Sequence, residues 1–320
     1  MKLKRRTLLA ASLTVAAPSL GQAQEFPNKQ VRVVVPYPAG GGTDLVARLV
    51  TPRLGERWKQ TVIIDNKGGA SGILGSEIVA KAPADGYTLL ITTSAHTINP
   101  YTTKRLPYDT ERDFTPITIL VKGALTLVGS TKAGFDTMDK FLSAARAEPG
   151  RIQWGSTENT TRMIGELFRV RSGLKIENVA YKGAAPMLQE LTGGHIPVGF
   201  TSPLTAMSHH RAGTLRMLAV TSSQRLEVLP DVPTMAEAGI SGVDRPAWFA
   251  MFGPGNMPSD LARRIRDDVA AVLAEPETAA RIRDLASQPG GEPPDVFAQR
   301  IKEELAMWRD VAKQAEIEPE

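Results

Sequence analysis

Short apolar runs alternate with helical patterns through the first hundred residues of the chain. Three runs that are apolar at nearly every position, Val31–Val35, Thr61–Asp65 and Tyr87–Thr93, predict short buried strands. Between them, apolar residues recur at helical spacing over 45–54 and 73–82. Strands without a polar face, separated by helices, are typical of a parallel sheet covered on both faces. We therefore predict an α/β fold.

Two long apolar runs, Ile117–Ser130 and Ala247–Pro254, bracket a second α/β pattern. The strands predicted inside it are Ile152–Gly155, Ile176–Tyr181, Ile196–Phe200 and Leu215–Thr221. This arrangement predicts two crossovers between two lobes, with the second lobe inserted into the first. We place lobe 1 at 25–125 plus 247–320, where C-terminal helices complete it, and lobe 2 at 126–246.

Glycine-rich turns follow the first two predicted strands, at Pro36–Gly42 and Asn66–Gly72, and a polar tip at 94–97 follows the third. The carboxyl ends of parallel strands share one edge of a sheet, where α/β proteins bind ligands. A bare turn at a helix N-terminus offers its amide N–H groups to an anion, so these turns predict a carboxylate site. Two other readings are that the turns only reverse the chain, and that Gly69–Gly72 is a nucleophile elbow, G-x-S-x-G, without its last glycine.

The composition is ordinary for a globular protein, with 42% hydrophobic and 22% charged residues among 320. The chain contains no cysteine, which excludes disulfides, a thiolate nucleophile and cysteine metal ligands. None of the four histidines has H-x-x-x-H spacing, and neither glycine turn has a G-x-G-x-x-G or G-K-[ST] sequence. We therefore expect no enzyme activity, no metal and no cofactor.

Residues 1–24 have the pattern of a cleaved export signal. Four basic residues precede the apolar segment Leu8–Ala17, which is too short to span a bilayer, and Gly21-Gln22-Ala23 is a small-x-small cleavage motif. The Arg5-Arg6 pair leaves the general secretory and twin-arginine routes both open. Without this segment the basic residues number 38 − 4 = 34, against 34 acidic residues. A chain with no net basic field is not expected to bind nucleic acid.

Five segments, in order, resemble the substrate-binding receptors of tripartite tricarboxylate transporters, the Bug or TctC family. The segments are VVVPYPAGGGTDLVAR, VIIDNKGGASGILGSEIVAKAPADGYTLL, NPYTTKRLPYDTERDFTPIT, YKGAAPMLQELTGGHI and LAVTSSQRLEVLPDVPTMAEAG. The resemblance implies a two-lobed periplasmic binding protein, a Venus flytrap of type II-like architecture with two hinge crossovers. It also implies a periplasmic monomer that captures a small carboxylate and delivers it to the membrane permease subunits of such a transporter.

The same resemblance implies which residues hold the ligand. In the family, the two glycine turns hold one carboxylate through main-chain N–H groups and bridging waters, and the second lobe reads the rest of the ligand. In lobe 1 the expected ligand-binding residues are Tyr37, Ala39, Gly42, Thr43, Asp44, Ala70, Ser71, Thr93 and His96. In lobe 2 they are Ser156, Asn159, Thr160, Thr161, Lys182, Gly183, Ala184 and Thr201.

Some of these positions have a second reading. Asp44 either contacts the ligand or stabilises the start of its helix as a first-turn acid. His96, on the predicted strand-end tip, either contacts the ligand or lies outside the site. Trp248 and Phe249 are read as hinge or core residues. Thr201 stands where many relatives carry an aspartate, and a neutral hydroxyl cannot neutralise an ammonium group. We therefore hypothesise a di- or tricarboxylate, an aromatic acid or a hydroxy acid as the ligand, and not an amino acid. The alternative functions are a receptor that signals to a membrane sensor protein and, more distantly, an α/β hydrolase.

Overall fold

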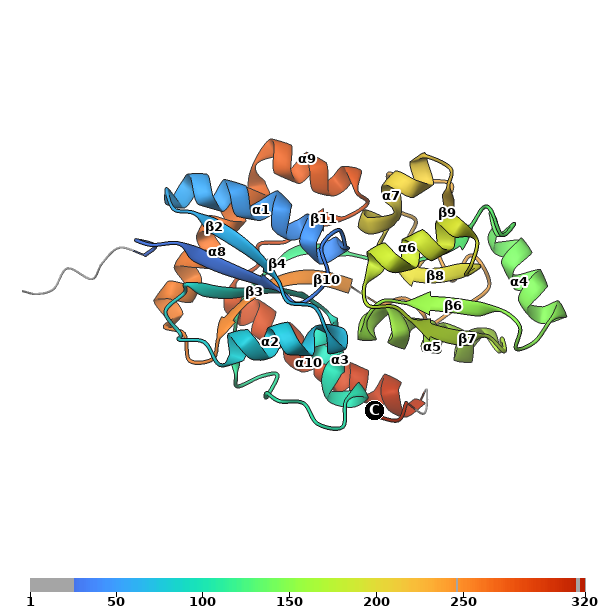
Figure 1. Ribbon diagram of the computed structural model, residues 1–320, viewed down its shortest axis with the longest axis horizontal. Coiled ribbons are helices and arrows are strands. Elements are labelled where there is room, and N and C mark those ends of the chain that lie inside the picture. The colour runs from blue at the N-terminus through green and yellow to red at the C-terminus, as the bar shows by residue number, and fades with distance from the viewer. Residues whose placement is uncertain (1–25, 246, 315–316, 320) are drawn as a thin grey trace, which may run out of the picture.

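The computed structural model describes residues 26–245, 247–314 and 317–319. The predicted export signal, residues 1–24, lies outside the described residues. Within them the chain forms two lobes side by side, each built on its own β-sheet and flanked by helices (Figure 1). The predicted α/β fold is confirmed.

The first sheet contains six strands in the order β11-β4-β10-β3-β1-β2. The strands are β1 Val31–Val35, β2 Val62–Asn66, β3 Thr88–Thr93, β4 Phe114–Gly123, β10 Ala247–Pro254 and β11 Gln288–Pro289. β1 pairs in parallel with β2 and β3, as the alternation of strands and helices predicts, and β10 runs antiparallel to β3 and β4. The helices of this lobe are α1 Gly42–Trp58, η1 Ala70–Gly72, α2 Ile73–Ala80, α3 Ala95–Thr102, α8 Ser259–Ala274, α9 Pro276–Asp284 and α10 Pro294–Gln314.

The second sheet contains five strands in the order β7-β6-β8-β5-β9. The strands are β5 Thr126–Ser130, β6 Gln153–Ser156, β7 Glu177–Ala180, β8 Val198–Thr201 and β9 Leu215–Val220, and the helices are α4 Met138–Ala147, α5 Asn159–Ser172, α6 Ala184–Gly193 and α7 Pro203–Arg211. β6 pairs in parallel with β7 and β8, and β5 runs antiparallel to β8 and β9. The two sheets share one arrangement. In the first, β1 lies between β2 and β3, and the antiparallel strand β10 lies beside β3. In the second, β6 lies between β7 and β8, and the antiparallel strand β5 lies beside β8.

The chain crosses between the sheets twice. β4 ends at Gly123 and β5 begins at Thr126, and the chain returns between Val220 of β9 and Ala247 of β10. The apolar run 117–130, which the sequence suggests is one long strand, is thus two strands in different sheets. Apolar periodicity does not separate them because most positions of both strands are buried.

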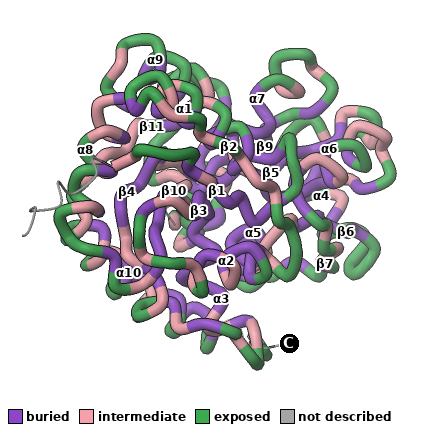
Figure 2. The backbone as a smooth tube through the Cα atoms, turned by 60° about the vertical axis from the view of Figure 1, so that its left-hand side comes forward, coloured by how far each residue is buried: buried purple, intermediate pink, exposed green. Residues whose placement is uncertain are grey.

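The core of the first lobe lies on both faces of its sheet. Side chains alternate along β1: Val33 packs with Val50 of α1 and Ile265 of α8, whereas Val34 on the opposite face packs with Phe297 of α10. Figure 2 shows the resulting pattern, with buried strands at the centre and exposed positions on the outer helices. Full burial of such side chains stabilises the fold by roughly 1.5–3 kcal/mol each, which explains why the strands lack polar faces.

The C-terminal helix α10 contributes to both lobes. Its first half places Phe297 and Ile301 in the core of the first lobe. Its last turns place Trp308 and Val311 in a cluster that contains Phe168 of α5. The predicted C-terminal helices are therefore present, but the last of them also packs against the second lobe.

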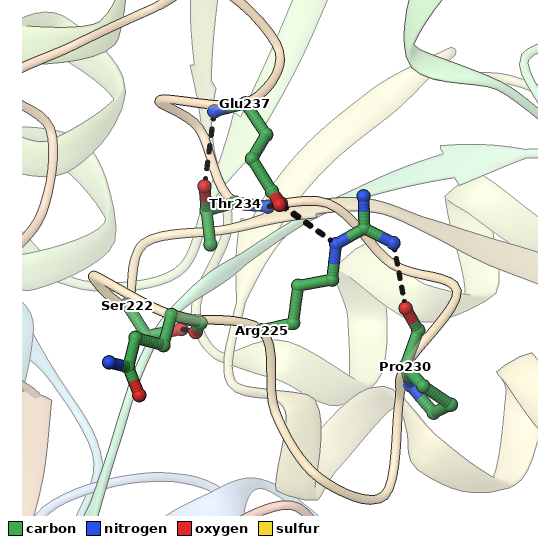
Figure 3. Close-up of polar contacts among 6 residues, drawn as sticks. Ser222, Arg225, Pro230, Thr234 and Glu237 are labelled. Carbon is green, nitrogen blue, oxygen red and sulfur yellow. Dashed lines mark hydrogen bonds and ion pairs between the residues drawn. The ribbon is translucent and has the colours of Figure 1, made fainter.

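The segment between β9 and β10 is held by a parallel bridge between Val220 and Thr234 and by side-chain hydrogen bonds. Arg225 Nε donates to both carboxylate oxygens of Glu237, at 3.1 and 2.9 Å, and Arg225 Nη1 donates to the carbonyl oxygen of Pro230 at 2.8 Å (Figure 3). Glu237 accepts from the amide of Thr234 at 2.8 Å, and the Thr234 hydroxyl accepts from the amide of Glu237 at 3.1 Å (Figure 3). This reciprocal pairing is the pattern of a capping box, and it fixes the proline-rich connection before the chain returns to the first sheet.

Candidate functional site

The two lobes meet at a cleft that contains two cavities. We call the cavity lined by residues 41–43 the first-turn cavity, and the cavity lined by residues 68–73 the second-turn cavity. Each is lined by residues of both lobes. The residues common to both linings are Tyr37, Pro38, Thr157 and Glu158.

The cavities differ in size. The first-turn cavity measures about 60 Å³ and the second-turn cavity about 820 Å³. Because one water needs roughly 10–15 Å³ on this measure, the first-turn cavity has room for about four to six waters or for one compact organic molecule. The second-turn cavity is the larger, more accessible part of the cleft.

Two helices from opposite lobes begin at the first-turn cavity without a side-chain cap. α1 begins after the N-cap Gly41, and α6 begins at Ala184 after the N-cap Gly183. The first N–H groups of a helix have no intrahelical partner, and the positive end of the helix dipole points the same way. The two helix ends together make this cavity favourable for an anion.

The first turn needs glycine for two separate reasons. Gly40 has φ +84°, in the left-handed region that favours glycine. A Cβ on Gly42 would lie 2.8 Å from both Phe249 Cζ and Thr205 Oγ1, and Thr205 belongs to the other lobe. A Cβ on Gly41 would make its nearest contact at 3.7 Å, which is ordinary packing. The close approach of the lobes is therefore most sensitive to the residue at position 42.

The second turn is a run of four residues with positive φ. The values are +144° for Gly69, +47° for Ala70, +51° for Ser71 and +86° for Gly72. Left-handed geometry costs a residue other than glycine about 1–2 kcal/mol, and such strain is common at ligand-binding loops. The amide of Gly72 is already bonded to the carbonyl of Gly69 at 3.1 Å. The glycines of the two turns thus line different cavities, although Tyr37 and Pro38 of the first turn line both, and some of the turn amides are used within the protein.

Asp44 lies at the start of α1 but faces the protein. Its buried carboxylate accepts from the amide of Gly40 at 2.9 Å, from Arg48 Nε at 2.8 Å and from Asn66 Nδ2 at 3.1 Å. Burial favours a higher pKa for Asp44, but the hydrogen bonds from Arg48, Gly40 and Asn66 outweigh it and lower the pKa. Of the two readings of Asp44, this geometry fits the structural one, and Asp44 is not among the residues lining either cavity. Ala39 is exposed and is also absent from both linings.

His96 lies inside an aromatic cluster behind the cleft. Its ring packs on Tyr108, Phe114 and Phe252, with centroid distances of 5.8, 4.6 and 4.8 Å. Both ring nitrogens are buried, and burial lowers the pKa of His96 to about 4, although a backbone contact with Thr110 opposes this shift in part. His96 does not line either cavity, so contact with a ligand is not compatible with this placement. The strand-end position suggested the cleft, but α3 begins at Ala95 and directs the ring into the core.

The other predicted residues line one cavity or the other. Those at the first-turn cavity are Tyr37, Gly42, Thr43, Thr93, Thr160, Thr161, Gly183, Ala184 and Thr201. Those at the second-turn cavity are Ala70, Ser71, Ser156, Asn159 and Lys182, with Tyr37 again. Residues far apart in sequence are therefore brought to one cleft.

Asn159 also joins the two lobes. Its side-chain Nδ2 donates to Asn99 Oδ1 at 2.8 Å and to Thr102 Oγ1 at 2.7 Å, and both partners lie on α3 of the first lobe. The hydroxyls of Ser94 and Thr160 lie 3.3 Å apart across the same junction. Since an amide NH₂ has two hydrogens, Asn159 can offer a ligand only its oxygen.

Sequence reasoning missed Glu158, which lies in both cavity linings. Glu158 is the N-cap of α5, and its carboxylate accepts from the amides of Thr160 at 3.0 Å and Thr161 at 3.4 Å. It also accepts from the Thr93 hydroxyl of the other lobe at 3.2 Å, and the Tyr37 hydroxyl lies 3.0 Å from Thr93 Oγ1. Burial raises the pKa values of both Glu158 and Tyr37.

Glu158 bears on the predicted ligand class. We hypothesise a ligand other than an amino acid because Thr201 offers no negative charge, but Glu158 brings a carboxylate to the same cavity. The neutral residue at position 201 therefore does not by itself decide between these ligand classes. A glutamate in the polar segment 156–161 looks like a solvated turn residue, and no local signal in the sequence distinguishes it from one.

Trp248 and Phe249 of β10 also line the first-turn cavity. Trp248 is buried, and its indole Nε1 donates to both carboxylate oxygens of Glu304 on α10, each at 2.9 Å. Trp248 thus connects the return crossover to the C-terminal helix. Its position agrees with the predicted hinge or core role and adds a cavity wall to it.

Comparison with known proteins bears directly on the family. The family model described as "Tripartite tricarboxylate transporter family receptor" matches residues 46–317. The chain belongs to this family. The predicted resemblance is confirmed, and the family consists of periplasmic solute receptors and not of enzymes.

Individual relatives of this protein match nearly its whole chain. A protein of Pseudomonas sp. (strain P51), described as "UPF0065 protein in tcbD-tcbE intergenic region", is 30% identical over 311 residues, which is 96% of this chain and 93% of the relative. A solved R. palustris protein with adipate is 33% identical, covers 92% of this chain and 100% of its own, and superposes with a TM-score of 0.89. MatC from Rhodopseudomonas palustris with bound malate is 29% identical, covers 89% and 99%, and has a TM-score of 0.84.

Neither a membrane-spanning helix nor a metal-binding cluster occurs among the described residues. No helix within 26–245, 247–314 and 317–319 is both long and apolar enough to cross a membrane. The same residues contain no group of three or more histidine, cysteine, aspartate or glutamate side chains arranged to hold a metal ion.

Proposed function

We propose that this receptor captures a small carboxylate between its lobes and delivers it to the membrane components of a tripartite tricarboxylate transporter. The ligand carboxylate would lie in the first-turn cavity against the N-termini of α1 and α6. The observation that carries the proposal is that these two uncapped helix ends come from opposite lobes and line one cavity. A ligand held by both ends would stabilise the closed arrangement of the lobes.

Two relatives support the chemical class. The R. palustris protein was solved with adipate and MatC with malate, and both ligands are small carboxylates. For the present chain, hydrogen bonds from main-chain donors to a charged acceptor contribute about 1.5–3 kcal/mol each. Three or four of them could supply micromolar affinity, near −8 kcal/mol, after the costs of association.

The export signal supports a periplasmic location for the mature chain. The basic residues, apolar segment and cleavage motif within 1–24 are those of a cleaved leader. Expression in a bacterial host, followed by N-terminal sequencing of the periplasmic protein, tests this part. A mature protein that keeps residues 1–24 would contradict it.

The binding proposal is tested by thermal denaturation of the mature protein with a panel of mono-, di- and tricarboxylates, hydroxy acids and aromatic acids. A ligand at a concentration of 100 Kd stabilises the folded state by about 2.7 kcal/mol, which gives a clear rise in melting temperature. The variant Ala184→Asp places a carboxylate at the start of α6, and we expect at least a hundredfold loss of affinity for the best ligand.

Ala184→Ser is the matched control, because it keeps a small neutral side chain at the same position. We expect affinity within threefold of the unsubstituted protein. Circular dichroism checks that both variants fold. If no carboxylate in the panel binds, or if Ala184→Asp binds the ligand normally, the proposed anion site is wrong.

A further inference from the structure

Glu158 brings a carboxylate into the first-turn cavity, where we propose that the ligand carboxylate binds. Glu158 lines the first-turn cavity, and among the described residues that line this cavity there is no lysine or arginine. Its donors are the neutral amides of Thr160 and Thr161 and the neutral hydroxyl of Thr93. Arg162 and Lys182 line the second-turn cavity together with Glu158, so it is in the first-turn cavity that a compact ligand meets this acid without a cation in the lining.

The partners of this carboxylate are all neutral hydrogen-bond donors. Oε2 of Glu158 accepts from the amide of Thr160 and the hydroxyl of Thr93, and Oε1 accepts from the amide of Thr161 at 3.4 Å, a long hydrogen bond. The Thr160 hydroxyl also hydrogen-bonds to Glu158. A ligand group facing Glu158 in the cavity therefore meets hydrogen-bond acceptors and not a positive charge.

Capping of α5 does not by itself explain a glutamate here. N-cap positions favour serine, threonine, aspartate and asparagine, whose short side chains reach the first amides of the helix. Glu158 caps α5 and also reaches Thr93 on the other lobe, 65 residues away in sequence. It thus places its charge at the junction of the lobes and in the walls of both cavities.

We propose that Glu158 sets the class of ligand: a molecule with one carboxylate, held at the N-termini of α1 and α6, and with a hydrogen-bond donor facing Glu158. The donor is a hydroxyl, amide or ammonium group in place of a second carboxylate. A second carboxylate would face the Glu158 carboxylate in the same small cavity, where two neighbouring carboxylates do not both ionise readily. This inference rests on the proposed function and narrows it.

The test uses matched ligands that differ only at the second end. At four carbons these are succinate, succinamate, 4-hydroxybutyrate and 4-aminobutyrate, and the same four end groups are compared at three and six carbons. Isothermal calorimetry at pH 7.5 measures each Kd for the mature protein. We expect the best donor-ended ligand to bind at least tenfold tighter than the diacid of the same length.

Two substitutions separate charge from capping. Glu158→Gln removes the charge at nearly constant size, and Glu158→Asn keeps a side chain that caps helices well. We expect both to lower the ratio of donor-ended to diacid affinity at least tenfold. Glu166→Gln is the control, because Glu166 lies on the same helix, pairs with Arg169 and lines neither cavity, and it should leave the ratio unchanged.

The outcomes distinguish this inference from the proposal on which it rests. If carboxylates bind but diacids bind as tightly as donor-ended ligands, the role of Glu158 is wrong and the carboxylate receptor stands. The same holds if the ratio is unchanged in both Glu158 variants. If no ligand of either class binds at any length, both the proposed function and this inference are wrong.

Discussion

Pro38 of the first glycine turn lies directly against Gly183 of the opposite lobe. A Cβ built on Gly183 would lie 3.1 Å from Pro38 Cδ and 3.2 Å from Pro38 Cγ, and Gly183 has φ +128°. The contact brings the N-terminus of α6 to the turn that precedes α1. The lobes therefore meet at the two helix ends that are proposed to share the ligand carboxylate.

Gly183→Ala should weaken this closure. The substitution adds a methyl group against Pro38 and forces an L-residue into a left-handed region, which costs roughly 1–3 kcal/mol. We expect ligand affinity to fall at least tenfold, measured by calorimetry, and small-angle scattering to show a more open average shape.

Gly173→Ala is the matched control for Gly183→Ala. Gly173 also has positive φ, +68°, but no atom lies within 4 Å of its added Cβ. It should lose a similar stability without losing affinity. Equal affinity of Gly183→Ala and the unsubstituted protein would show that this contact does not matter for binding.

Glu304 should make the protein less stable as pH rises. Burial raises the pKa of Glu304 to about 7, although hydrogen bonds from Trp248 and Thr97 lower it in part. An acid whose pKa is higher in the folded state stabilises the fold fully below its unfolded pKa near 4.5, and this contribution is lost as pH rises through 7. The pKa difference corresponds to about 3 kcal/mol. Glu304→Gln should remove this fall in the free energy of unfolding, measured by urea denaturation at pH 4.5 and 8.

The exposed neighbour Glu303 supplies the control for that experiment. Glu303→Gln changes an acid on the same helix that lies at the surface, so it should keep the pH dependence of the unsubstituted protein. A Glu304→Gln variant with an unchanged pH dependence would mean that Glu304 does not titrate in this range.

His96 should make the protein less stable as pH falls. Burial lowers the pKa of His96 to about 4, below its ordinary value of 6.5. The neutral ring therefore stabilises the fold above pH 6.5, and this contribution is lost as pH falls toward 4, up to about 3 kcal/mol. His96→Phe keeps an aromatic ring within the cluster, and the variant should lose less stability than the unsubstituted protein between pH 7 and 4.5.

The pH dependence of the unsubstituted protein sums the two opposing effects, so only differences from the variants isolate each one. Urea denaturation of His96→Phe and of the unsubstituted protein at both pH values gives that difference for His96. Identical acid sensitivity of the two proteins would contradict a buried neutral histidine.

The sequence predicted much of the fold because local burial leaves a periodic trace. The bounds of β1, Val31–Val35, and of β10, Ala247–Pro254, are those of the apolar runs in the sequence. The sequence also predicts the glycine turn after β1. The structure gives the reason for its glycines, since Gly40 has a positive φ and Gly42 has no space for a side chain. These features depend on a residue and its near neighbours, or on burial of a whole strand.

The tertiary structure alone decided which polar groups face the cleft. Thr93 ends β3 and His96 lies three residues later, yet Thr93 lines the cavity and His96 is buried among aromatic rings. Glu158 looks like a solvated turn residue in sequence, and only its meeting with Thr93, 65 positions earlier, places it between the lobes. Periodicity records whether a side chain is buried, but the group it faces depends on how distant elements pack, and no local pattern contains that information.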